Sequence, residues 1–414
     1  MASASSETLD AIASRSRALS VACDSPSTSA SSRSRERLDA IDALRDAVGE
    51  CDGSTTERAD EALRAGEDAL ATCVVEPAGE VSAQRATMTL CACYRATGAG
   101  SMYSRANQLL DAATEKNATA FAKASAFKAL TRLVKEFRER LSGNASAYAR
   151  AASANFRPND DAECRRAATA FFAAACEAST GNLDGKSIAG YHKALTRIES
   201  DKSEGVRAAV AEAFGMLTLA WSASREKGAA GDGDLDVHAT AQRVVRALSD
   251  ESARVRDAAS GALVNVALAC ARGAFAESRD GEFETAAEPA FARAARVFMY
   301  APFVAASRGH SRADERVCVG IARAWSMFVH RAQSENIADR YEIRECTVKT
   351  LLSRAIENTP LACACAIYVI RAGCLVNADE ASLRATLSIV IDALKSEDSC
   401  RVLVATRVAK DIVE

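Results

Sequence analysis

The feature of this sequence that most constrains its fold is a short pattern that recurs along the chain. Each copy has an acidic residue, then an apolar residue directly beside an arginine, then small residues that lead into a helical apolar stripe. The copies are Asp161 with Cys164–Arg165, Asp201 with Val206–Arg207, Asp250 with Val255–Arg256 and, more weakly, Arg316 with Val317. An amphipathic helix precedes the second and the third copy, so the repeating unit contains two helices.

The spacing of these copies predicts the architecture. The arginines of the first three copies lie 42 and 49 residues apart. A period of about 40 to 50 residues with two helices per unit is typical of HEAT and armadillo arrays. One such unit cannot bury its apolar face alone, so neighbouring units must stack. We therefore predict an all-α, HEAT/armadillo-type α-solenoid of antiparallel helix pairs, with a plain helical bundle as the alternative.

The same pattern predicts a ladder of polar links between units. The acidic residue is expected to cap free N–H groups where the second helix of each unit begins. The arginine is expected to reach an acidic turn in the neighbouring unit, and the small residues allow close helix packing. The predicted structural ladder comprises Asp161, Arg165, Asp201, Arg207, Asp250, Arg256 and Arg316.

The composition agrees with a helical chain. Hydrophobic residues make up 49% of the sequence, whereas aromatic residues make up only 5% and there are 6 prolines. Much of the apolar content is alanine, which favours helices and leaves the face of a sheet unfilled.

The two ends of the sequence differ in character. Residues 1–34 are rich in Ser, Ala and Arg and predict a disordered tail, with an organelle transit peptide as the alternative that Glu7 and Asp10 oppose. Residues 35–414 form the expected solenoid, interrupted by acidic, glycine-containing insertions near 224–236 and 277–288. Insertions in solenoids often carry binding, although simple surface loops are the alternative.

Charge and hydropathy restrict the partners. The chain has 52 basic and 55 acidic residues and a net charge of -3, which argues against binding nucleic acid unless a basic patch forms in three dimensions. No run of 18 apolar residues is present, so no transmembrane segment is predicted.

The residues that usually carry chemistry are scattered. The 14 cysteines include no Cys-x-x-Cys array, and Cys91/Cys93 and Cys363/Cys365 diverge by about 200° on a helix. We expect buried, reduced thiols and a reducing compartment. The four histidines form no His-Glu-x-x-His pair, and no phosphate-binding loop or nucleophile elbow is present. The sequence predicts no catalytic, cofactor-binding or metal-binding residue, and a chain that is not an enzyme.

The order of several segments resembles a known family. The segments are Arg85–Cys91, Asn107–Asp111, Lys123–Leu130, Tyr148–Ala151, Lys193–Leu195, Val206–Ala211, Arg316–Val319, Trp325–Val329 and Cys365–Ala372. In this order they resemble the N-terminal region of the HEAT repeat-containing protein 5 family, to which the plant SWEETIE-like proteins belong. Members of that family are much longer solenoids, so we expect this chain to be one end of a larger scaffold.

The resemblance implies a function and a location. It implies a non-enzymatic cytoplasmic scaffold, peripheral at Golgi and endosome membranes, that binds the clathrin adaptor complex and its accessory proteins. Such a scaffold would serve sorting between the trans-Golgi and endosomes, including retrograde transport. The alternative is a generic HEAT scaffold or carrier, similar to a karyopherin or to a phosphatase regulatory subunit.

Overall fold

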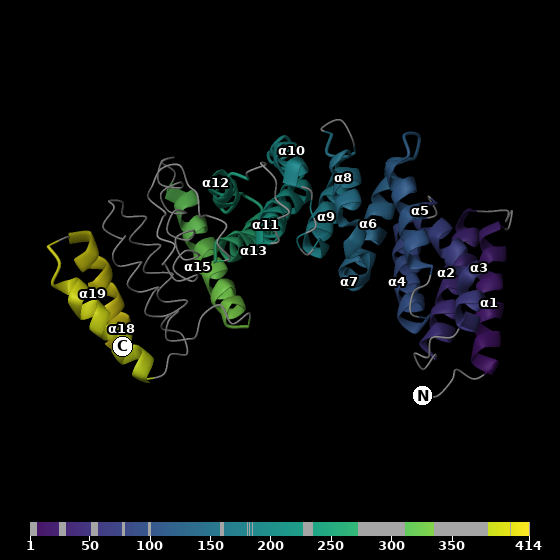
Figure 1. Cartoon of the computed structure of the whole chain (residues 1–414), viewed down its shortest axis with the longest axis horizontal. Coiled ribbons are helices and arrows are strands. Elements are labelled where there is room, and N and C mark those ends of the chain that lie inside the picture. Colours follow the sequence, from purple (N-terminus) through teal and green to yellow (C-terminus); the bar gives the residue numbers. More distant parts are fainter. Residues whose placement is uncertain are drawn as a thin grey trace. The chain divides into compact units, whose positions relative to one another are not determined.

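The structure is a computed structural model, and it is all-helical throughout the residues it describes. These residues are 6–24, 30–50, 57–76, 79–97, 101–157, 161–179, 181, 183, 185–226, 235–271, 311–334, 380–397 and 399–413. Within them no strand occurs, and the helices stack in successive pairs (Figure 1). The chain folds as the predicted all-α helical-repeat array, but it divides into two compact units, Met1–Ala178 and Ser179–Glu414.

The first unit contains the helices from α1 to α9. They are α1 (Ser6–Asp24), α2 (Ala30–Gly49), α3 (Glu57–Val75), α4 (Glu80–Thr97), α5 (Met102–Thr114), α6 (Ala120–Glu136), α7 (Arg138–Leu141), the 3-10 helix η1 (Ser142–Asn144), α8 (Ala145–Ser153) and α9 (Ala162–Ala178). Helix α1 packs on α2 and α3, α2 packs on α4, and α6 packs on α9. Each helix pair therefore covers the apolar face of the next, as stacking of incomplete units requires.

The N-terminal residues differ from the disordered tail that we expected over residues 1–34. Helix α1 occupies most of that segment, and α2 begins at Ala30. Leu9, Ile12, Ser16 and Leu19 are all buried, and they recur at steps of three and four residues. This apolar stripe is narrow and lies among Ser, Ala and Arg, so the average composition concealed it. The segment is part of the packed array.

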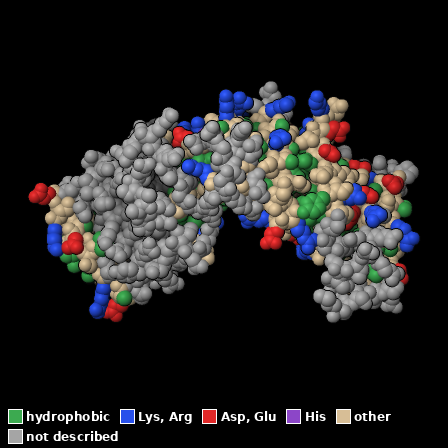
Figure 2. All heavy atoms as spheres, in the orientation of Figure 1, with side chains coloured by type: hydrophobic (Ala, Val, Ile, Leu, Met, Phe, Trp, Pro, Cys, Tyr) green, Lys and Arg blue, Asp and Glu red, His purple; other side chains and the backbone are tan. Residues whose placement is uncertain are grey.

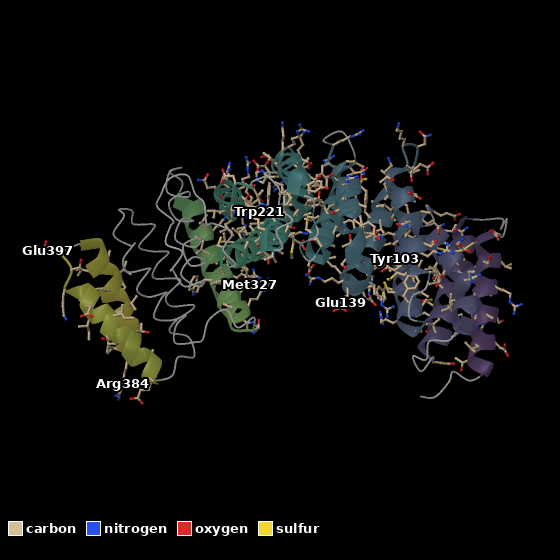
Figure 3. The ribbon with its side chains drawn as sticks, in the orientation of Figure 1. Tyr103, Glu139, Trp221, Met327, Arg384 and Glu397 are labelled. Carbon is tan, nitrogen blue, oxygen red and sulfur yellow. The ribbon has the colours of Figure 1, made fainter. Side chains whose placement is uncertain are left out.

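The second unit contains the remaining helices. They are α10 (Gly185–Thr196), α11 (Glu204–Glu226), α12 (Val237–Ala247), α13 (Ala253–Ala271), α15 (Ser311–Ser334), α18 (Glu380–Leu394) and α19 (Ser399–Val413). Helices α10 and α11 form one pair and α12 and α13 the next, while α11 packs on α13 and α13 on α15. Trp221 of α11 is 2% exposed and lies in the core of this unit (Figure 3).

Both predicted insertions fall largely outside the described residues. Residues 224–226 belong to the last turn of α11, and the Asp236 side chain caps α12 by accepting a hydrogen bond from the Ala239 N–H at 2.8 Å. Residues 227–234 and the whole of 277–288 are not described.

One contact in the second unit requires glycine. A Cβ atom at Gly215 of α11 would lie 2.6 Å from the Cα of Ala262 on α13. That distance is about 1 Å shorter than an ordinary carbon–carbon contact. The small residues of the repeated pattern thus permit an approach of two helix backbones, which holds the two repeats together.

Candidate interaction surface

The acidic residues of the repeated pattern cap the helices that follow them. The carboxylate of Asp201 accepts a hydrogen bond from the Ser203 N–H at 2.8 Å, and that of Asp250 accepts one from the Ser252 N–H at 2.9 Å. In the first unit, Asp161 accepts hydrogen bonds from the N–H groups of residues 163 and 164 at 2.9 and 3.2 Å. The bonds to Asp161 satisfy amides that the first turn of α9 leaves free, whereas Ser203 and Ser252 directly precede α11 and α13.

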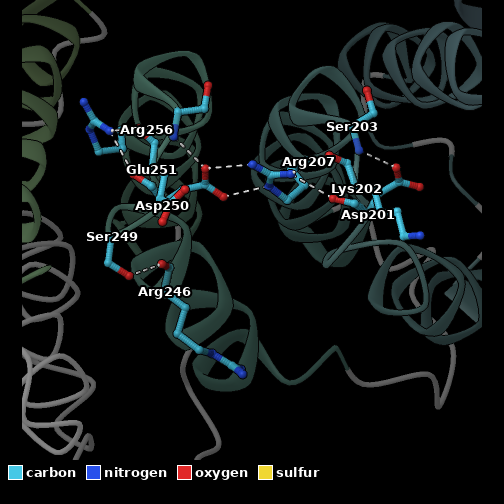
Figure 4. A network of polar contacts seen from close by, with 10 residues as sticks. Asp201, Lys202, Ser203, Arg207, Arg246, Ser249, Asp250, Glu251 and Arg256 are labelled. Carbon is cyan, nitrogen blue, oxygen red and sulfur yellow. Dashed lines mark hydrogen bonds and ion pairs between the residues drawn. The ribbon is translucent and has the colours of Figure 1, made fainter.

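The arginine of the second copy reaches the next repeat. Arg207 donates to both carboxylate oxygens of Asp250, from Nε at 2.8 Å and from Nη2 at 3.0 Å (Figure 4). Its Nη1 also donates to the carbonyl oxygens of Asp201 and Lys202 at 2.9 and 3.2 Å. One guanidinium therefore ties the turn of its own repeat to the turn of its neighbour, in the two-pronged geometry that arginine favours.

The charged state of this pair follows from its contacts. Burial raises the pKa of Asp250, but hydrogen bonds from Arg207 and the Ser252 N–H outweigh burial and hold the pKa below its usual range. The hydrogen bond to Asp250 likewise raises the pKa of Arg207. Both groups are therefore charged near neutral pH, where the link persists.

The other predicted ladder residues lie in different settings. Arg256 donates from Nη1 to the carbonyl oxygens of Asp250 and Glu251, both at 2.8 Å, which repeats the self-contact of Arg207 (Figure 4). Arg165 is 8% exposed in α9 of the first unit, and Arg316 is exposed on α15. Between α13 and α15 the polar links use other residues, because Arg323 pairs with Asp257 and Arg331 donates to Asn265 at 2.8 Å.

A second ion pair completes the link between the two central repeats. Arg243 Nη1 of α12 lies 2.6 Å from each carboxylate oxygen of Glu199. The two pairs border a groove of about 450 Å³, whose apolar floor includes Val210, Phe214 and Val244. The acidic lining residues are Glu199, Asp201 and Asp250, and the basic ones are Arg207, Arg243 and Arg246. This groove has no excess of either charge, so it offers little attraction to a charged partner.

A larger groove in the first unit was not predicted from the sequence. It lies along α4, α6 and α9, has a volume of about 650 Å³, and is called the α4–α6 groove below. Its lining residues are Glu80, Ala83, Gln84, Thr87, Ser125, Lys128, Thr131, Arg132, Lys135, Glu136 and Arg166. Four of these are basic and two are acidic, whereas Ala83, Thr87, Ser125 and Thr131 are small. Because Glu163 also pairs with Lys128 and Arg166, the basic excess is one charge, and the small side chains leave room for a main chain.

Lys128 stands at the centre of this groove and joins three helices. Its Nζ lies 2.6 Å from Glu80 Oε1 on α4 and 2.7 Å from Glu163 Oε1 on α9. Arg166 Nε also donates to Glu163, at 2.7 Å. The hydrogen bond from Arg166 lowers the pKa of Glu163 to about 2, with burial opposing it and Lys128 adding to it. The charges of Lys128 and Arg166 are thus neutralised, and on the same helix as Lys128 the Arg132 Nε lies 3.9 Å from Glu136 Oε2.

A signal for this groove was present in the sequence. Lys128, Arg132 and Lys135 recur at steps of four and three residues within α6, so they share one helix face. The acidic partners lie 48 residues before Lys128 and 35 residues after it, and neither spacing belongs to the repeated pattern. On the face drawn in Figure 2, both basic and acidic side chains are scattered over the described part of the surface.

Other expectations about chemical groups concern the described residues only. Within them no cluster of three or more His, Cys, Asp or Glu could hold a metal ion, and none of the described helices has the length and hydropathy to cross a membrane. The side chains of Cys91, Cys93, Cys164, Cys176 and Cys270 are buried and form no disulfide. The ring centroid of His192 lies 5.3 Å from that of Phe214, and burial followed by the charge of Arg243 lowers the pKa of His192.

Comparison with known proteins gives distant similarities in fold alone. No protein-family model matches the chain, and no curated protein matches it. An engineered protein of the Northeast Structural Genomics Consortium is 13% identical, with 98% of this chain and 99% of that chain covered and a TM-score of 0.37. A second engineered protein from the same consortium is 15% identical, with 74% and 98% covered and a TM-score of 0.30. Kap121p is 12% identical, with 99% of this chain and 46% of that chain covered and a TM-score of 0.37. At these scores the likenesses carry no argument about partners.

Proposed function

We propose that this chain is a helical-repeat scaffold that binds other proteins, and that the α4–α6 groove holds an extended acidic segment of a partner. The observation that carries the proposal is a 650 Å³ groove along three helices, in which four basic side chains outnumber the acidic lining residues Glu80 and Glu136 and the adjacent Glu163 by one charge. Small lining side chains leave space for a peptide backbone, and the Arg132 side chain, whose Nε lies 3.9 Å from Glu136 Oε2, is 43% exposed and accessible to a partner. Complementary charge steers and orients such a partner more than it adds affinity.

Peptide binding tests this proposal directly. A fluorescein-labelled peptide of alternating Glu and Leu is titrated with the full chain, and fluorescence anisotropy is measured at low and at physiological salt. The same peptide with Gln in place of Glu is the matched ligand control. We expect binding of the acidic peptide that weakens as salt increases, and at least tenfold weaker binding of the Gln peptide.

Variants locate the binding. The double variant Arg132→Glu with Lys135→Glu reverses two charges in the groove and is expected to abolish binding of the acidic peptide. Lys116→Glu with Arg157→Glu makes the same change of net charge at two exposed residues that do not line the groove, and it should bind as the wild type does. Equal affinity of both double variants, or equal binding of the Glu and Gln peptides by the wild type, would refute the assignment of the groove.

For the cellular partner, we propose the clathrin adaptor complex and its accessory proteins, with the chain peripheral at Golgi and endosome membranes. The resemblance to the HEAT repeat-containing protein 5 family supports this choice. Proximity labelling in cells with the wild type and the Arg132→Glu, Lys135→Glu variant tests it. Adaptor subunits should be labelled by the wild type and lost with the variant. Labelling of nuclear cargo without adaptor subunits would instead favour the karyopherin-like alternative.

A further inference from the structure

Two cysteine thiols meet between the first two helix pairs of the first unit. Cys23 lies in the last turn of α1 and Cys73 in the last turn of α3, and their Sγ atoms are 3.3 Å apart. Both are free thiols, and Cys73 is fully buried, whereas Cys23 is partly exposed to solvent. A disulfide needs a sulfur–sulfur distance of about 2.05 Å, so the two atoms would have to approach by only about 1.2 Å.

The surroundings give the two thiols different reactivity. The hydrogen bond with Cys73 lowers the pKa of Cys23, and the Arg37 guanidinium adds to this effect although burial opposes it. The hydrogen bond to Cys23 and burial together raise the pKa of Cys73. Arg37 is held in place because it donates to the carbonyl oxygen of Cys23 at 2.8 Å and pairs with Glu76. The accessible sulfur, which the Arg37 charge favours as a thiolate, is therefore the nucleophile, and the buried Cys73 sulfur lies 3.3 Å from it.

We propose that Cys23 and Cys73 are a redox-active thiol pair that hydrogen peroxide converts into a disulfide joining α1 to α3. The Cys23 thiolate attacks one peroxide oxygen, the O–O bond breaks, and Cys23 becomes a sulfenic acid while hydroxide leaves. The Cys73 sulfur then attacks the Cys23 sulfur, the S–O bond breaks, and the oxygen that Cys23 had gained leaves as water with the Cys73 proton. A small dithiol reverses the step by exchange and is itself oxidised to its cyclic disulfide.

The position of the bond determines its effect. Helix α1 belongs to the first helix pair and α3 to the second, so the disulfide covalently joins neighbouring repeats. It links residues 50 positions apart and thereby restricts the unfolded chain. For a unit of this size, we expect the thermal transition of the first unit to rise by about 10 °C on oxidation. Peroxide would thus stiffen the end of the array at which α1 lies.

The experiment oxidises the full chain with a slight excess of hydrogen peroxide, blocks the remaining thiols with N-ethylmaleimide, and identifies linked peptides by mass spectrometry. We expect a peptide pair joined through Cys23 and Cys73 that a small dithiol separates. Far-UV circular dichroism should show the rise in the melting transition of the first unit. Both tryptophans, Trp221 and Trp325, lie in the second unit, so the fluorescence transition should not move.

Variants distinguish this reaction from general oxidation. Cys73→Ser removes the resolving thiol, so dimedone should then label Cys23 as a lasting sulfenic acid, and Cys73→Ala provides a second variant of the same kind. Cys91→Ser removes a buried thiol of α4 and should leave the linked peptide unchanged. Alkylation of both Cys23 and Cys73 after oxidation of the wild type would overturn the proposal, as would absence of dimedone on Cys23 in both Cys73 variants.

Discussion

Replacing Gly215 by alanine adds a methyl group where α11 packs against α13. The new Cβ would lie 2.6 Å from the Cα of Ala262 and 2.9 Å from both the Cβ and the carbonyl oxygen of the same residue. Because two of these three atoms belong to the backbone, no change of rotamer relieves the overlap. The two helices would have to separate by about 1 Å, and they carry the Arg207–Asp250 link between their repeats.

Two opposing effects determine the size of the change. Alanine is favoured over glycine inside a helix by about 1 kcal/mol. Overpacking a close contact costs about 1–3 kcal/mol, and an overlap with backbone lies at the upper end of that range. We therefore expect Gly215→Ala to lower the free energy of unfolding of the second unit by about 1–2 kcal/mol.

The matched control is Gly261→Ala on α13, where an added Cβ would meet no atom within 4 Å. Only helix propensity acts there, so the control should raise the free energy of unfolding by about 0.5–1 kcal/mol. Urea titration followed by tryptophan fluorescence measures both variants, since both tryptophans lie in the second unit. A Gly215→Ala variant as stable as the Gly261→Ala control would show that the close approach of α11 and α13 is absent.

Three further predictions concern other parts of the array. Ile12→Ala should destabilise the first unit by about 2–5 kcal/mol in the circular dichroism transition, because the Ile12 side chain is fully buried, whereas a disordered tail would tolerate it. A double-mutant cycle of Arg207→Lys and Asp250→Asn should give a coupling of about 1–2 kcal/mol, and purely additive effects would contradict the two-pronged pair. The pKa of Glu163 is about 2 in the folded chain and 4.5 for the ordinary group. Its contribution to the free energy of unfolding is therefore fully present above pH 4.5 and is lost as the pH falls toward 2. Glu163→Gln should therefore lower the free energy of unfolding by a few tenths of a kcal/mol at neutral pH and leave it unchanged near pH 2. The effect is small because the Glu163 side chain is 45% exposed. A destabilisation that grows as the pH falls would contradict this prediction.

The fold class was predictable because its signal is distributed over the whole sequence. Apolar residues at helical steps, abundant alanine and the recurring acidic turn all favour stacked helices independently of one another. The first helix was missed because the expectation for residues 1–34 used composition instead of periodicity. Leu9, Ile12 and Leu19 are too few to change that composition, yet their spacing is enough for one buried face.

The polar contacts were predictable only where they coincide with the repeated pattern. Arg207 and Asp250 occupy equivalent turns of successive repeats, so the pattern itself points to their meeting. The contacts of Lys128 depend on the lengths of several intervening helices and turns, which the sequence does not give to the accuracy of one helical turn. The pairing of Cys23 with Cys73 depends in addition on α1, the helix that composition had concealed.

These contacts share a property that explains how an alanine-rich array keeps its register. Polar links in both units join residues 35 to 66 positions apart, and many of them, such as Arg37–Glu76 and Lys128–Glu80, span 39 to 48 positions. Small apolar side chains offer many nearly equivalent ways for two helices to slide along each other, because the ridges they form are shallow. A charged pair at a fixed position makes only one of these alignments favourable, since sliding by a turn would leave partly buried charges without partners. Apolar burial therefore supplies most of the stability, and the spacing of the polar links determines which repeat faces which.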